Sequence, residues 1–145
     1  MTLQADRPQA IADRAGALVG TPFRLHGRNP DRGLDCIGLC AQCIGAAGVK
    51  ADIPNGYGLR ASDADRICRL MQHLGFRQIS GPTASSVSEW RIGDILLTRP
   101  APLQLHMLVH TAEGMVHAHA GLRRVVCTPG LPDGRILHLF RLMES

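Results

Sequence analysis

The stretch LDCIGLCAQC, residues 34–43, decides the fold, because an aspartate is followed there by three cysteines spaced four and three positions apart. Apolar side chains recur at intervals of three and four residues up to GAAG, which predicts a helix from Asp35 to about Gly48. Asp35 is a good N-cap, so Cys36 would occupy the first helical position. There the free N–H groups and the helix dipole are expected to lower the pKa of the thiol.

Two metal sites are alternatives to a reactive thiol. Cys36, Cys40 and Cys43 have the Cys-x3-Cys-x2-Cys spacing of an iron–sulfur motif. On a helix, however, the outer two sulfurs are separated by roughly 10 Å of rise, whereas one cluster needs converging thiolates. Zinc could use the histidines of residues 106–119, but no further spacing completes four ligands. In the third interpretation Cys36 is a nucleophile, and the other two cysteines pack in the core.

The composition favours one domain with an aliphatic core. A chain of 145 residues can form its own core, and we expect one domain over residues 1–145. Aromatic residues make up 3% and the arginines are scattered, which argues against a nucleic-acid partner. No stretch is long enough to span a bilayer, and the first 16 residues lack the apolar run of a signal peptide. We therefore expect no membrane partner and synthesis in the cytoplasm without a signal peptide.

Helical patterns dominate the first half of the chain and strand patterns the second. Apart from the helix after Asp35, the spacing predicts helices over 8–20 and over 62–76, the latter with Ser62 as N-cap. Short apolar or alternating runs then predict five strands, within 90–98, 103–110, 114–120, 123–128 and 134–143. Helices followed by an antiparallel meander predict the α+β class, with the sheet packed on the helices.

Four of the seven histidines lie between residues 106 and 119. If the second and third predicted strands form a hairpin, His106 faces His119 directly and His117 diagonally, all on one side of the sheet. One imidazole can take the proton of a thiol while a second polar group orients it. The hairpin register leaves His117 and His119 as alternatives for that second group.

Four segments together resemble the NlpC-type cell-wall peptidases, which are papain-like cysteine enzymes. The segments are GTPFRLHGRNPDRGLDCIGL (20–39), RIGDILLT (91–98), LHMLV (105–109) and MVHAHAG (115–121). The resemblance extends over about residues 20–120. It implies a papain-like α+β fold in which N-terminal helices pack on a C-terminal antiparallel sheet of about five strands.

The resemblance also implies roles for three residues. Cys36 resembles the family nucleophile, His106 its general base, and His117, in MVHA, the third residue that orients the base. The implied reaction is hydrolysis of the bond between γ-D-glutamate and the following diamino acid in the stem peptide of bacterial peptidoglycan. It requires no cofactor and no metal.

Two positions depart from the family pattern. Phe23 stands where a tyrosine is common, which removes a hydroxyl that could stabilise the oxyanion. Ile37 replaces a serine, which changes how the amine end of the substrate is held. The alternative function is therefore a catalytically weak or inactive tail-tip or wall-binding module of the same fold. An aliphatic residue at position 37 also resembles peptidases of phage tails and gene-transfer particles, which implies tail-like particle proteins as partners and action in the periplasm.

Overall fold

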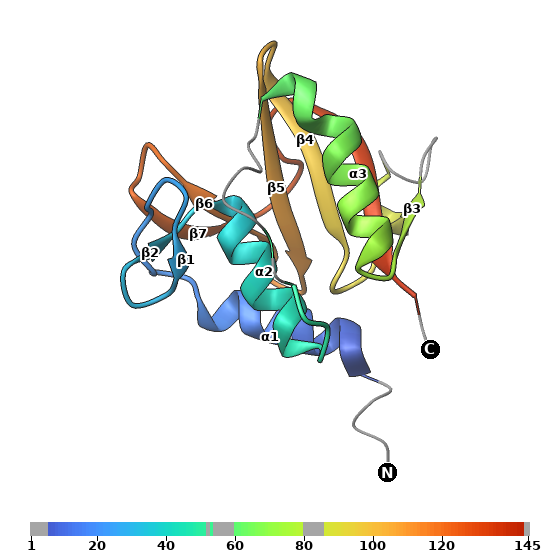
Figure 1. The fold of residues 1–145 in the computed structure, drawn as a ribbon, viewed down its shortest axis with the longest axis horizontal. Helices are drawn as coiled ribbons and strands as arrows, with labels where there is room; N and C mark the ends of the chain where they lie inside the picture. Colours follow the sequence, from blue (N-terminus) through green and yellow to red (C-terminus); the bar gives the residue numbers. More distant parts are fainter. Residues whose placement is uncertain (1–5, 52, 54–59, 80–85, 144–145) are drawn as a thin grey trace.

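The computed structural model describes residues 6–51, 53, 60–79 and 86–143. Its helices and strands follow one another as drawn in Figure 1. They are α1 (Arg7–Ala17), β1 (Arg28–Asn29), β2 (Gly33–Leu34), α2 (Cys36–Ala46), α3 (Ala64–His73), β3 (Phe76–Ile79), β4 (Ile95–Ala101), β5 (Gln104–Thr111), β6 (Gly114–His119), β7 (Arg124–Thr128) and β8 (Arg135–Leu142). Among the described residues, no helix combines the length and the apolar character needed to cross a bilayer.

Six strands form one antiparallel sheet in the order β3-β8-β4-β5-β6-β7, while β1 and β2 form a separate hairpin. The predicted α+β class is confirmed, and all five predicted strands are present. Two details differ from the predicted meander. The last strand, β8, returns to pair with β4 instead of β7. The sequence pattern also does not reveal β3, because this strand follows α3 so closely that its first residue, Phe76, fits the helical periodicity.

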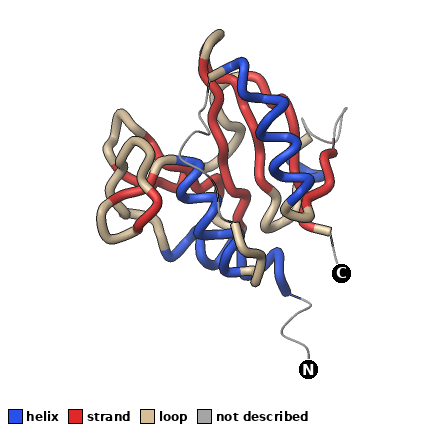
Figure 2. The backbone as a smooth tube through the Cα atoms, viewed as in Figure 1, coloured by secondary structure: helices blue, strands red, loops and turns tan. Residues whose placement is uncertain are grey.

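The three helices share one hydrophobic core with one face of the sheet. Ile11 of α1, Ile44 of α2 and Met71 of α3 pack in the same buried cluster as Val109 and Phe140. All three helices therefore cover the same side of the sheet (Figure 2). The other face carries a smaller cluster, formed by Trp90, Leu96, Leu108, Met115 and Leu139.

The start of α2 was predicted correctly, whereas the start of α3 was not. Asp35 is the N-cap of α2, and its carboxylate accepts a hydrogen bond of 2.8 Å from the N–H of Gly38. Ser62 does not cap α3, because residues Ala61–Asp63 form a 3-10 turn and the α-helix begins after them. In this turn the carboxylate of Asp63 accepts the backbone N–H of Arg60 at 2.9 Å.

The loop before β1 lies directly on the first turn of α2. A Cβ atom added at Gly38 would lie 2.0 Å from the carbonyl oxygen of Gly27, so only glycine allows this approach of two backbones. Gly45, on the same helix, has no atom within 4 Å of its would-be Cβ. The two glycines thus differ in what a methyl group would meet.

We expect Gly38→Ala to lower the free energy of unfolding by about 3 kcal/mol, because the added methyl group displaces the loop from the helix. Gly45→Ala is the matched control and should raise it by about 0.5–1 kcal/mol through better helix propensity. Urea denaturation of both variants measures the difference. Equal free energies of unfolding for the two variants would contradict the close backbone contact.

Candidate active site

One cavity of about 770 Å³ brings the three predicted site residues together. Cys36 reaches it from the start of α2, His106 from β5 and His117 from β6. Phe23 and part of the loop between β7 and β8 line it as well. Residues from five separate parts of the chain therefore line this cavity.

The thiol occupies the place where β5 and β6 separate. These strands pair over only three residues on each side of their turn, in the predicted register. Beyond that point the expected pairing of His106 with His119 is not formed. The start of α2 lies at this separation, where the backbone of Met107 makes a hydrogen bond to the sulfur of Cys36. Cys36 is thereby placed beside the residue that follows His106.

Two histidines and a threonine form a hydrogen-bonded chain. Nε2 of His106 lies 2.9 Å from Nδ1 of His117, and Nε2 of His117 lies 3.1 Å from Oγ1 of Thr128. The two imidazole rings are nearly perpendicular, at 85°. His119 has a different contact, since its Nδ1 accepts the backbone N–H of Leu122 at 3.0 Å. The geometry thus joins His106 to His117 and not to His119.

The other ring nitrogen of His106, Nδ1, takes no part in this hydrogen-bonded chain. When Nε2 of His106 carries the proton, it donates to Nδ1 of His117, and the Nε2–H of His117 donates to Thr128. A threonine hydroxyl can accept or donate, so it is compatible with this arrangement. In this tautomer Nδ1 of His106 has a free lone pair, which is the form that can accept a proton.

Thr128 is a residue of the site that the sequence patterns do not indicate. It lies on β7, two positions after Val126, which pairs with His117. Residues two apart on a strand share a face, so Thr128 is on the side of the sheet that carries the histidines. The alternation of side chains along β7 is the one sequence signal that could have identified Thr128. Its use requires the register between β6 and β7, which the sequence does not show.

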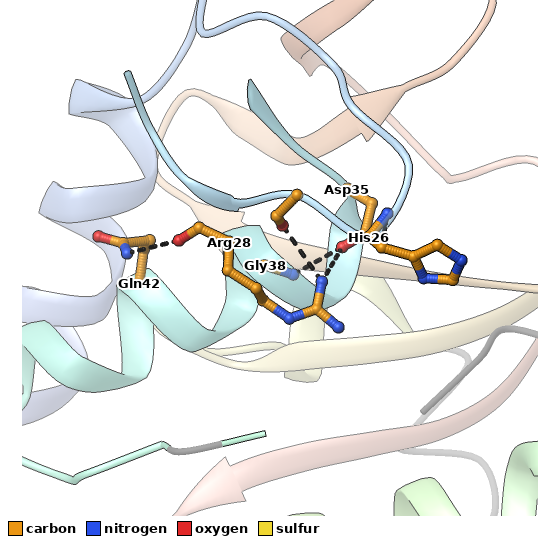
Figure 3. Close-up of polar contacts among 6 residues, drawn as sticks. His26, Arg28, Asp35, Gly38 and Gln42 are labelled. Atoms are coloured by element: carbon orange, nitrogen blue, oxygen red, sulfur yellow. Dashed lines mark hydrogen bonds and ion pairs between the residues drawn. The ribbon is translucent and has the colours of Figure 1, made fainter. Parts of the chain in front are cut away.

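The carboxylate of Asp35 is fully engaged in holding the start of α2 (Figure 3). Its Oδ1 accepts from Gly38 and from Nη1 of Arg28, the latter at 2.9 Å. Its Oδ2 accepts the backbone N–H of His26 at 3.0 Å. The side chain of Gln42 donates to the carbonyl of Arg28 at 3.2 Å, which ties β1 to the middle of α2. Asp35 is therefore a structural residue that fixes both the helix start and the loop beside it.

Burial dominates the electrostatics of the thiol. Desolvation raises the pKa of Cys36 to about 12, although the hydrogen bond from the Met107 backbone lowers it, and the charge of Asp35 raises it further. The predicted lowering of this pKa is therefore wrong. The sequence places Cys36 at the positive end of a helix, but it does not show that the thiol is 2% exposed.

The imidazole of His106 is neutral as well. Burial, together with the charges of His117 and His119, lowers the pKa of His106 to about 4. Burial also lowers the pKa of His117. Near neutral pH the site thus contains a protonated thiol and neutral imidazoles, and not a thiolate–imidazolium pair.

The other residues singled out from the sequence lie in the core or at the cavity. Cys40 and Cys43 are buried in the core on the same helix as Cys36. No three His, Cys, Asp or Glu side chains among the described residues are arranged to hold a metal ion. Phe23 lines the cavity, whereas Ile37 is buried in the core and is not among the lining residues.

No protein-family model and no curated protein matches the sequence. Solved structures, in contrast, match nearly the whole chain. The P60 domain of an antigen from M. avium subspecies paratuberculosis aligns with a TM-score of 0.64 and 18% identity, over 99% of both chains. The NlpC/p60 domain of the peptidoglycan hydrolase SagA aligns with a TM-score of 0.59 and 20% identity, over 93% of this chain and 98% of that one.

This chain has the NlpC/P60 fold. The peptidoglycan hydrolase RipB from Mycobacterium tuberculosis has the same fold, with a TM-score of 0.60 and 22% identity over 98% of this chain and 67% of that chain. The papain-like α+β fold predicted from the four sequence segments is therefore confirmed, and its sheet has one strand more than the five expected.

The lowered pKa of His106 predicts how stability depends on pH. The unfolded chain binds a proton at this residue below pH ~6.5, whereas the folded protein does so only near pH 4. Acidification from pH ~6.5 towards pH ~4 therefore favours unfolding. The free energy of unfolding falls over this range by about 2–3 kcal/mol. His106→Gln should remove this part of the loss. The exposed His73→Gln should keep it.

Urea denaturation at pH 7 and pH 4.5 measures the free energy of unfolding for the wild type and both variants. A smaller loss in His106→Gln than in the other two proteins is the expected result. The same loss in all three proteins would show that His106 is not held neutral by burial.

Proposed function

We propose that this protein is a cysteine endopeptidase that hydrolyses a peptide bond in the stem of bacterial peptidoglycan. One observation carries the proposal: Cys36, His106 and His117 line a single cavity, and His106 is hydrogen-bonded to His117. RipB and SagA, which have the same fold, are peptidoglycan hydrolases, and this supports the substrate class. The resemblance in sequence favours the bond between γ-D-glutamate and the diamino acid.

The first step starts from neutral groups. As the sulfur of Cys36 attacks the carbonyl carbon, its proton moves to Nδ1 of His106. Transfer during attack is required, because a thiol pKa of about 12 and an imidazole pKa of about 4 disfavour a preformed ion pair. His106 keeps its Nε2–H directed at Nδ1 of His117, which maintains the ring orientation while it is charged.

Backbone N–H groups at the start of α2 stabilise the oxyanion. The N–H groups of the first helical turn have no partner within the helix, and Asp35 already occupies that of Gly38. The N–H of Cys36 belongs to the attacking residue itself, so we assign it as the oxyanion donor. Phe23 cannot add a hydroxyl, so we expect slower turnover than in a related enzyme with tyrosine there.

The second half of the reaction restores the enzyme. The imidazolium of His106 protonates the nitrogen of the leaving amine as the C–N bond breaks, which leaves a thioester on Cys36. Nδ1 of His106 then accepts a proton from water, and the hydroxide attacks the thioester carbonyl. Breakdown of this second intermediate releases the carboxylate, and the proton returns to the thiol.

A second function has its own supporting observations. The thiol is protonated and almost fully buried, and Phe23 lacks the hydroxyl, which favours a wall-binding module without turnover. In that case the cavity binds stem peptides without cutting them. For either function we propose that a phage-tail or tail-like particle delivers this protein to the cell wall. This setting is supported only by the aliphatic residue at position 37, Ile37.

Cys36→Ala should reduce the release of stem-peptide fragments by at least about a thousandfold, because no other group can form the thioester. Cys68→Ala, which removes a half-buried thiol from α3, is the matched control and should retain wild-type release. Mass analysis of purified sacculi after incubation with each protein measures the products. Release by Cys36→Ala would contradict the mechanism. Binding to sacculi without release by the wild type would favour the inactive module.

A further inference from the structure

The loop between β7 and β8 forms a wall of the cavity. Four of its residues line the cavity: Pro129, Leu131, Pro132 and Asp133. The end of the loop lies close to β4, since a Cβ added at Gly134 would lie 2.5 Å from the Cα of Pro100 and 2.6 Å from the carbonyl oxygen of Arg99. Gly134 has a φ of +85°, which glycine adopts without strain. Asp133 thus lines the cavity directly before the glycine that packs against β4.

Two acidic side chains among the described residues line the cavity, and they differ in what they contact. Asp35 is 4% exposed, and its carboxylate already accepts three hydrogen bonds. Asp133 is exposed and forms no ion pair with any described residue. Of the two carboxylates, Asp133 is thus the one that can still accept a hydrogen bond from a ligand.

The position of Asp133 relates it to the reacting groups. Asp133 lines the same cavity as His106 and His117, and its negative charge partly offsets the lowering of the His117 pKa by burial. Leu131 and Pro132, beside it, give this end of the cavity an apolar lining. A carboxylate accepts charge-assisted hydrogen bonds from an ammonium group, and these are stronger than hydrogen bonds between neutral groups.

We propose that Asp133 binds a primary ammonium group of the substrate and thereby selects stem peptides with a free amine. This inference rests on the proposed peptidase function and names the substrate that it favours. The ammonium group has two possible sources in a stem peptide: the N-terminus of its first residue and the side chain of its diamino acid. Both present the same chemistry, so the experiment has one arm for each.

The test uses three synthetic peptides: L-Ala-γ-D-Glu-L-Lys-D-Ala, its Nα-acetyl form and its Nε-acetyl form. For the wild type we expect acetylation of the recognised amine to raise KM about tenfold, with kcat within about twofold. Asp133→Asn should show the high KM for all three peptides, whereas Asp133→Glu should recover part of the preference. Asp31→Asn makes the same change of charge at an exposed position outside the cavity and should behave as the wild type.

The outcomes separate this inference from the proposed function. Equal KM values for the three peptides in the wild type, or an unchanged preference in Asp133→Asn, overturn the role of Asp133 and leave the peptidase intact. If the wild type cleaves none of the peptides, the proposed function fails. Calorimetry then measures the binding of the same three peptides and tests whether Asp133 recognises the amine. Amine-dependent binding that is lost in Asp133→Asn supports the inference, and binding without that dependence, or no binding, overturns it.

Discussion

The site depends on the hydrogen bonds and the ion pair that the carboxylate of Asp35 forms. This carboxylate caps α2 through Gly38, pairs with Arg28 and accepts the backbone N–H of His26. The first residue of the helix, the β1–β2 hairpin and the loop before it are therefore fixed relative to one another. Because α2 begins at this point, the sulfur of Cys36 meets β5 where β6 has separated from it. The separation of these strands in turn lets His106 reach His117.

Burial then decides the protonation state of the reacting groups. A helix N-terminus stabilises a negative charge by typically 0.3–1 kcal/mol. The pKa of Cys36 rises from 9.0 to about 12, which corresponds to about 4 kcal/mol against the thiolate. Desolvation therefore outweighs the dipole, and the negative Asp35 adds to it. The same burial keeps His106 neutral, so thiol and imidazole are suited to proton transfer within one step and not to charge separation beforehand.

Local patterns in the sequence were sufficient for much of the fold. The periodicity after Asp35 predicted α2 and its cap, and alternation in the second half predicted the five strands from β4 to β8. Features that depend on pairing distant segments were not accessible in this way. These include β8 beside β4, the separation of β5 from β6, and the contact of Thr128 with His117. The predicted direction of the shift in the Cys36 pKa was wrong for the same reason. The local sequence shows where the helix begins, but it does not show the packing around the thiol.

The central claim is that His106 is a neutral imidazole with its proton on Nε2, where it contacts His117, and its lone pair on Nδ1, the nitrogen that we assign as the acceptor of the thiol proton. Two-bond ¹⁵N–¹H correlation spectra of histidine-labelled protein at pH 7 report the protonation of each ring nitrogen directly. The account predicts Nε2–H for both His106 and His117, with unprotonated Nδ1 atoms. A proton on Nδ1 of His106, or a doubly protonated ring, would contradict it.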